Sequence, residues 1–216
     1  NRVNGWIIDF GGLITISNIM GNKYAQNVYK TFKHMTDDVQ KVDLFNKLLS
    51  NVEKVDAKEY QGNLRGLVHS VKFLPEKVQS DMYSKLYALD SIPVKIGLVE
   101  NLPNYKYLEC ADEIINGLSQ HPHEKIKEVI AREIKHFPDK IRHELFESLS
   151  LEDNNKIKKY LARNINYYYR NIANRINIFD NLAKNSDEYA DMALINSLKY
   201  FGEDKIFERF ERFFAK

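Results

Sequence analysis

The feature that most constrains the fold of this chain is a close repeat of one proline-led segment. The segments at 74–86 and 137–149 match in residue character at most positions: Leu-Pro-Glu-Lys-Val-Gln-Ser-Asp-Met-Tyr-Ser-Lys-Leu and Phe-Pro-Asp-Lys-Ile-Arg-His-Glu-Leu-Phe-Glu-Ser-Leu. In both, apolar residues follow the proline at spacings of three and four, which is typical of an amphipathic helix. The two segments start 63 residues apart, close to the length of two helix pairs of about 31 residues each. Self-similarity of this kind favours a fold built from stacked helix pairs.

All five prolines of the chain lie between residues 74 and 150: Pro75, Pro93, Pro103, Pro122 and Pro138. Proline suits the first turn of a helix, where its missing N–H costs nothing, and it pushes the preceding residue out of the α region. We therefore expect every proline except Pro93 to open an amphipathic helix and to stop the helix before it, and we expect Pro93 to begin or interrupt a short piece through Ile96 and Val99. For Pro103, the expected buried face begins at Tyr107.

The remainder of the chain carries one strand signal and then helical patterns. β-Branched and aromatic residues on both sides of Gly11-Gly12 predict a hairpin over 6–17. Thr36 is placed to cap a helix whose buried face starts at Val39. A stripe at 187–198 predicts another helix, with Met192 in its core face.

Ser150, with Asp153 three residues later, resembles a capping box and predicts the start of a longer helix. Its apolar stripe runs at spacings of three and four throughout: Ile157, Leu161, Ile165, Tyr168, Ile172, Ile176 and Phe179. A last helix after Gly202 carries a stripe of Phe207, Phe210, Phe213 and Phe214, whose default reading is core packing. If that helix is uncovered, the stripe becomes a site for a partner or a membrane surface.

These patterns predict an all-α fold in a single domain, because no low-complexity linker divides the chain. We expect an N-terminal hairpin at 1–20, a helix-pair array at 22–150 and C-terminal helices at 151–216. From about Asp37 to Phe179 the chain resembles HEAT-type helical-repeat proteins in its paired helices, its prolines at helix starts and its aliphatic stripes. The resemblance implies an α-solenoid with an extended curved face that usually binds proteins, sometimes nucleic acid, and seldom carries a catalytic centre. The alternative is an irregular helical bundle whose proline-led starts reflect ordinary helix N-terminal chemistry.

The overall charge gives no direct indication of a partner. The chain has 32 basic and 30 acidic residues and a net charge of +2, so nucleic-acid binding would need a local patch. Its single cysteine, Cys110, lies on an apolar stripe and reads as a small core residue. The absence of an internal disulfide fits a cytoplasmic location without excluding secretion of a processed protein. No apolar run approaches the roughly 20 residues of a membrane span.

A polar stripe beside the apolar face of the predicted 156–175 helix is the candidate partner-binding site. It consists of Lys156, Lys159, Arg163, Tyr167, Arg170 and Asn174. Basic residues interleaved with tyrosine can neutralise phosphates and stack on exposed bases. The alternative is a solvated helix face whose lysine and arginine stems cover apolar surface.

Signals for catalysis or metal binding are weak. Asp9-Phe10-Gly11 resembles the metal-binding triplet of protein kinases, but the other kinase motifs are absent. Four histidines at 121, 123, 136 and 143 lack the spacing of zinc ligands. Acidic pairs such as Asp187-Glu188 lie at expected helix starts, where they compensate the helix dipole. We therefore expect no cofactor, no metal and no catalytic residues. The sequence predicts a non-enzymatic helical-repeat protein that binds a protein partner, with a nucleic-acid-binding protein as the alternative and an enzyme with dispersed residues left open.

Overall fold

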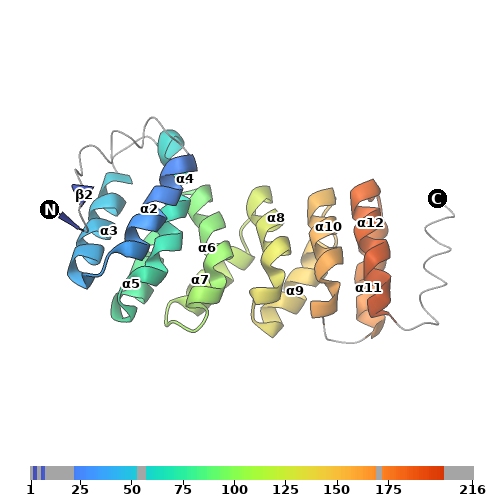
Figure 1. Ribbon diagram of the computed structural model, residues 1–216. Coiled ribbons are helices and arrows are strands. Elements are labelled where there is room, and N and C mark those ends of the chain that lie inside the picture. The colour runs from blue at the N-terminus through green and yellow to red at the C-terminus, as the bar shows by residue number, and fades with distance from the viewer. Residues whose placement is uncertain (1, 4–5, 8–21, 53–56, 169–171, 202–216) are drawn as a thin grey trace. The chain divides into compact units, whose positions relative to one another are not determined.

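The computed structural model describes residues 2–3, 6–7, 22–52, 57–168 and 172–201 (Figure 1). The described part is almost entirely helical, which confirms the predicted all-α class. Its contacts divide the chain into two compact units, Asn1–Leu118 and Ser119–Lys216. The expectation of a single domain stays a prediction.

In the first unit, helix α4 packs against several neighbouring helices. The elements are α2 (Asn22–His34), α3 (Asp38–Val52), α4 (Ala57–Ser70), the 3₁₀ helix η1 (Val71–Phe73), α5 (Glu76–Ala88), α6 (Ile92–Tyr105) and α7 (Ala111–Ser119). Helix α4 packs against α2 and α6, and α5 packs against α6. A Cβ atom built on Gly97 of α6 would lie only 3.2 Å from the side chain of Val68 in α4. The glycine therefore lets these two helices approach closely.

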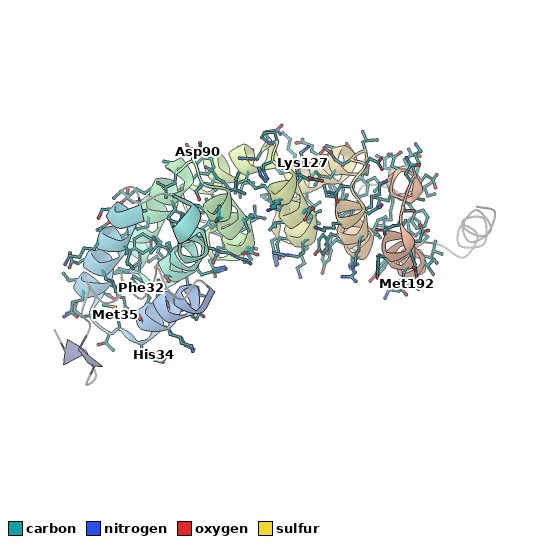
Figure 2. All side chains as sticks on the ribbon, turned by 90° about the horizontal axis from the view of Figure 1, so that it is seen from above. Phe32, His34, Met35, Asp90, Lys127 and Met192 are labelled. Atoms are coloured by element: carbon teal, nitrogen blue, oxygen red, sulfur yellow. The ribbon has the colours of Figure 1, made fainter. Side chains whose placement is uncertain are left out.

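The second unit consists of two rows of helices. Its elements are α8 (Glu124–Glu133), η2 (Ile134–His136), α9 (Asp139–Leu149), α10 (Asn155–Asn164), η3 (Ile165–Tyr167), α11 (Ile172–Ala183), α12 (Glu188–Ser197) and η4 (Leu198–Tyr200). Helix α10 packs against both α8 and α12. In Figures 1 and 2, α8, α10 and α12 form one row and α9 and α11 form the row behind it. We call α4, α6, α8, α10 and α12 the first helices, and α5, α7, α9 and α11 the second helices.

Each first helix ends in the same buried apolar triad. An aliphatic residue is followed four positions later by another, and three positions after that by an aliphatic or aromatic residue that we call the anchor. The triad recurs once in every helix pair, and all of its side chains are buried: Leu67/Val71/Leu74, Leu98/Leu102/Tyr105, Ile130/Ile134/Phe137, Leu161/Ile165/Tyr168 and Leu194/Leu198/Phe201. At four of these anchors the helix tightens into a 3₁₀ turn, and the anchor N–H donates to the carbonyl three residues back at 2.9 to 3.2 Å.

The second helices carry a repeated pattern of their own. Two adjacent buried residues are followed by a third after three positions, and this pattern also recurs once in every helix pair. The sets are Met82/Tyr83/Leu86, Ile114/Ile115/Leu118, Leu145/Phe146/Leu149 and Ile178/Phe179/Leu182. Burying one such side chain contributes roughly 1.5 to 3 kcal/mol. The helix pair is therefore the unit in which this chain builds its core, and the matching segments at 74 and 137 lie two pairs apart.

A polar residue recurs four positions before each anchor: Ser70, Asn101, Glu133, Asn164 and Ser197. The carboxamide of Asn164 donates to the carbonyls of Ala131 and Arg132 in α8 at 3.1 and 3.2 Å. The hydroxyls of Ser70 and Ser197 donate to carbonyls of their own helices at 2.8 and 2.7 Å. These groups satisfy backbone carbonyls near the helix ends, and Asn164 also ties α10 to α8.

At several anchors, a side chain from a second helix donates a hydrogen bond to the backbone carbonyl of the anchor residue. An anchor carbonyl has no partner in the helix that it ends, so a buried one needs another donor. The second helix that follows supplies this donor at three anchors. The side chain of Gln79 donates to the backbone carbonyl of Leu74 at 2.9 Å. In the same way, Arg142 donates to the carbonyl of Phe137 at 3.4 Å and Arg175 to that of Tyr168 at 2.8 Å.

The hairpin predicted over 6–17 is not supported. The described strand Trp6–Ile7 (β2) pairs antiparallel with Arg2–Val3 (β1), in a register that joins Val3 to Trp6. Residues 8–21, which include Gly11-Gly12 and the second predicted strand, lie outside the described residues. The predicted last helix and its phenylalanine stripe, at 202–216, also lie outside them.

The prediction for Pro103 was wrong. Pro103 lies in the last turn of α6 and opens no helix. Near a helix end, the loss of one N–H donor is tolerated. The next helix begins at Ala111, and Tyr107, expected to be buried, is 87% exposed in the connection. Pro75 and Pro138 do stand directly before α5 and α9, as predicted.

Two further local predictions were wrong. Asp37, and not Thr36, caps α3, since its carboxylate accepts from the N–H groups of Val39 and Gln40 at 2.9 and 3.0 Å. Val39 in the first turn is consequently 79% exposed. On α12, Met192 is 57% exposed and is not part of the core.

Candidate functional site

The long helix expected to carry the candidate binding residues is interrupted. Helix α10 ends at Asn164, η3 follows, and Tyr168 is extended with ψ 99° before α11 begins at Ile172. The prediction of one continuous helix through Phe179 was therefore wrong. Its start was also misplaced, because Asn154 caps α10 by accepting from the N–H groups of Lys156 and Ile157 at 2.8 and 3.1 Å.

The interruption distributes the six predicted binding residues over several elements. Lys156, Lys159 and Arg163 lie on α10, Tyr167 in η3, and Asn174 on α11, while Arg170 lies outside the described residues. Lys156 is involved in an ion pair with Glu128 of α8 at 3.5 Å. The five described residues therefore do not lie along one helix. Lys159 and Arg163 line a common groove.

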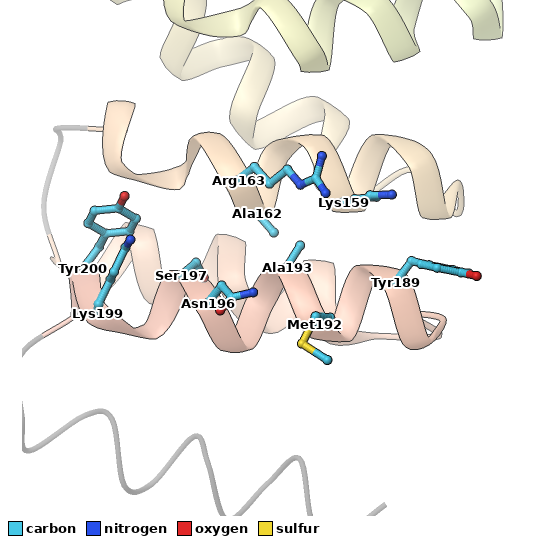
Figure 3. A pocket seen from close by; sticks show the side chains of 10 residues that line it. All are labelled: Lys159, Ala162, Arg163, Tyr189, Met192, Ala193, Asn196, Ser197, Lys199 and Tyr200. Atoms are coloured by element: carbon cyan, nitrogen blue, oxygen red, sulfur yellow. The ribbon is translucent and has the colours of Figure 1, made fainter.

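That groove lies between α10 and the α12–η4 segment and has a volume of about 280 Å³ (Figure 3). From α10 it receives Lys159 and Arg163, which are one helical turn apart. From the opposite side it is lined by Tyr189, Met192, Asn196 and Lys199, which are spaced by three, four and three residues and thus follow one face of α12 into η4. We call this hollow the α10–α12 groove.

The α10–α12 groove is positively charged. Lys159, Arg163 and Lys199 line it, and no aspartate or glutamate does so among the described residues. Three other lysines of the second unit have carboxylate partners: Lys127 with Glu152 at 2.5 Å, Lys156 with Glu128 at 3.5 Å and Lys158 with Asp153 at 2.9 Å. The three groove cations have no carboxylate partner within the part of the chain that the structure describes. The positive charge in the groove is therefore not neutralised there.

Aromatic rings lie against two of these cations. The ammonium nitrogen of Lys159 lies 5.2 Å from the ring centroid of Tyr189, and that of Lys199 lies 5.1 Å from the ring of Tyr200. Such cation–π contacts contribute about 0.5 to 1 kcal/mol at exposed sites. Between these pairs, Ala162 contributes small apolar surface from α10 (Figure 3). The arrangement can hold an anionic group and accept an apolar side chain beside it.

Asn174 lies in a different groove. This second hollow, of about 250 Å³, is lined by residues of α9 and α11, including Glu147, Asn177 and Asn181. The hydroxyl of Tyr168 donates to Glu147 at 2.7 Å along its wall. Since α9 and α11 form the second row of helices, Asn174 and Arg163 belong to different surfaces of the unit.

Sequence reasoning missed the half of the α10–α12 groove that α12 supplies. Tyr189, Asn196 and Lys199 were not candidates, and Met192 was assigned to the core. The helical spacing of these residues is visible in the sequence. What was missing is the packing of α12 against α10, which places them opposite Lys159 and Arg163.

Three titratable groups of the first unit have displaced pKa values: Tyr83, Tyr105 and Lys95. The rings of Tyr83 and Tyr105 lie 4.6 Å apart, and burial raises the pKa of both hydroxyls well above the usual range. Burial lowers the pKa of Lys95, whose ammonium lies 3.8 Å from the ring centroid of Tyr87. Cys110 is buried beside the tyrosine pair, as its core assignment predicts. We interpret this cluster as packing.

The described residues contain neither a metal-binding cluster nor a membrane span. Within those ranges, no group of three or more histidine, cysteine, aspartate or glutamate side chains is arranged to hold a metal ion. No helix among them is both long and apolar enough to cross a membrane. Comparisons with protein-family models, curated proteins and solved structures found no match.

Proposed function

We propose that this chain is a non-enzymatic helical-repeat protein of the α-solenoid type that binds a protein partner through the exposed surface of its helix pairs. The recurring buried triads support the repeat, because each pair uses its apolar side chains for packing and leaves a polar face outside. The packing of α10 against α8 and α12 supports stacking of successive first helices in the second unit. A HEAT-like curved surface and a cytoplasmic location belong to this proposal.

The observation that carries the proposal is the α10–α12 groove. It combines cations that lack carboxylate partners among the described residues with exposed apolar surface, since Tyr189 and Met192 are 69% and 57% exposed. Aromatic residues, methionine and arginine are enriched where proteins bind one another. A groove of this size and composition suits one or a few side chains of a partner.

Nucleic-acid binding is the second candidate function. It is favoured by the same cations, Lys159, Arg163 and Lys199, beside tyrosine rings. Binding of this type weakens steeply as salt neutralises the phosphates. Titration of the protein with duplex and single-stranded oligonucleotides over a salt series tests it, and absent or salt-insensitive binding excludes it.

The proposed function is tested by site-specific photo-crosslinking in native lysate. A photoreactive residue at Asn196, which is exposed in the groove, should crosslink to a defined protein. The matched control places the same residue at Lys140, which is exposed on α9 in the other row of the second unit. Equal crosslinking from both positions, or none from Asn196, would contradict binding at the α10–α12 groove. Circular dichroism of both variants checks that the helices are intact.

A further inference from the structure

We infer that the α10–α12 groove binds an acidic peptide segment, in which glutamate or aspartate side chains alternate with apolar ones. The inference rests on the proposed function and specifies the chemistry of the partner. Charge complementarity is the first argument. Three cations line the groove without a carboxylate from the described residues, and Lys127, Lys156 and Lys158, which have carboxylate partners, lie outside it.

The geometry of the cations fits carboxylates. Arg163 is exposed, has no carboxylate partner among the described residues and presents a planar guanidinium that can bind a carboxylate through two parallel hydrogen bonds. Lys159 precedes it by one helical turn, and Lys199 lines the groove from η4. The amide of Asn196, exposed on the α12 side, can pair with a peptide group. The groove can therefore bind two neighbouring acidic side chains at once.

The apolar part of the groove fits a peptide better than a polyphosphate. The small side chains of Ala162 and Ala193 form its base, and the thioether of Met192 is exposed at its edge. Methionine adapts its shape to varied apolar partners. A residue between two acidic positions of an extended peptide would contact this surface.

The surroundings of the groove disfavour nucleic acid. The rings of Tyr189 and Tyr200 already have lysine ammonium groups near their faces, at 5.2 and 5.1 Å, so a stacking base would have to displace a cation. The basic surface also fails to continue onto α8. On the neighbouring α8, Glu128 and Glu133 place carboxylates beside the exposed basic residues. A nucleic-acid backbone needs a longer cationic track than this.

The test measures fluorescence anisotropy of labelled probes with the full chain. The probes are a pool of peptides in which glutamate alternates with varied apolar residues, the same pool with glutamine in place of glutamate, and single-stranded oligothymidine. The glutamate pool should bind and the glutamine pool should bind at least tenfold more weakly. Arg163→Gln should weaken binding of the glutamate pool about tenfold, the loss expected for one charge-assisted hydrogen-bonding group. The matched variant Lys140→Gln should leave it unchanged.

Several outcomes would overturn the inference. Equal binding of the two peptide pools would remove the acidic requirement, and equal effects of Arg163→Gln and Lys140→Gln would remove the groove. Oligothymidine binding that Arg163→Gln abolishes, without binding of the glutamate pool, would assign the groove to nucleic acid. If the glutamate pool fails while Asn196 still crosslinks to a protein, the acidic peptide is wrong and the proposed function stands. If neither occurs, both are wrong.

Discussion

Arg175 in α11 donates two hydrogen bonds to the carbonyl of Tyr168, from Nε at 3.2 Å and from Nη2 at 2.8 Å. Its remaining nitrogen, Nη1, donates to the carbonyl of Tyr200 in η4 at 2.9 Å. One guanidinium thus satisfies backbone carbonyls at the ends of two successive first helices. These hydrogen bonds link two helix pairs in addition to their apolar packing.

Replacement of Arg175 by methionine should therefore destabilise the protein. Methionine keeps much of the side-chain stem but leaves the carbonyls of Tyr168 and Tyr200 without this donor, so the free energy of unfolding should fall by about 2 kcal/mol. Urea denaturation measures the change. The matched control is Arg163→Met on the exposed face of α10, which should change stability by less than about 0.5 kcal/mol. Equal effects of the two variants would show that the hydrogen bonds of Arg175 contribute nothing to the free energy of unfolding.

The close approach of Tyr87 to Gly117 predicts that Gly117→Ala lowers the free energy of unfolding when Tyr87 is present and raises it when Tyr87 is replaced by alanine. A Cβ atom at Gly117 in α7 would overlap the Tyr87 hydroxyl oxygen and would lie 2.8 Å from the carbon that bears it. Gly117→Ala should consequently cost about 1 to 2 kcal/mol, because the tyrosine must shift. In a Tyr87→Ala background the obstruction is gone, and Gly117→Ala should stabilise by about 1 kcal/mol through helix propensity. A double-mutant cycle by urea denaturation measures both values, and a cost that persists in the Tyr87→Ala background would contradict the explanation.

The buried tyrosine pair predicts opposite effects for two chemically identical substitutions. The hydroxyl of Tyr83 is buried without a hydrogen-bond partner among the described residues, whereas that of Tyr105 donates to the carbonyl of Leu98 at 3.0 Å. Tyr83→Phe should raise the free energy of unfolding by about 1 kcal/mol, because it removes an unsatisfied polar group. Tyr105→Phe should lower it by a similar amount. Thermal unfolding of the two variants provides the comparison, and a shift of both in the same direction would contradict these assignments.

The same pair predicts a loss of stability at alkaline pH. Burial raises the pKa of Tyr83 and Tyr105 in the folded state above the ordinary value of 10.0. Below pH 10.0 both tyrosines are protonated in the folded and the unfolded chain, so their contribution to the free energy of unfolding is fully present. Above that pH, the unfolded chain loses these protons while the folded chain retains them, so stability falls as pH rises, by up to about 1.4 kcal/mol per pH unit for each group. The Tyr83→Phe/Tyr105→Phe double variant should show a shallower fall in urea titrations above pH 10. Tyr107→Phe, at an exposed position, is the control and should leave the slope unchanged.

The helical class and the length of the repeating unit could be predicted from the sequence because both are local properties. The match of 74–86 with 137–149 reflects two helix pairs of the observed length. The acidic start of α12 was also predicted, and Asp187 does cap that helix by accepting from the N–H of Ala190 at 2.8 Å. Caps and apolar periodicity depend on residues within one or two turns.

The break after α10 could not be predicted from periodicity alone. The spacing of Ile165, Tyr168 and Ile172 is three and four, the same as in an uninterrupted helix. Proline marks the end of the first helix after Leu74 and Phe137, but no proline follows Tyr168. The chain turns there because burial of Tyr168 and the hydrogen bonds from Arg175 stabilise an extended residue. Both contributions come from packing between elements.

The sequence by itself thus determined where helices form and which residues are apolar on each of them. Only the tertiary structure decided which faces remain exposed and which distant residues meet. Lys159 and Tyr189 belong to different helix pairs, and they lie together because α10 packs against α12. A helical stripe has the same spacing whether a neighbouring helix covers it or not. For that reason the candidate site, first expected along one helix, is a groove between two.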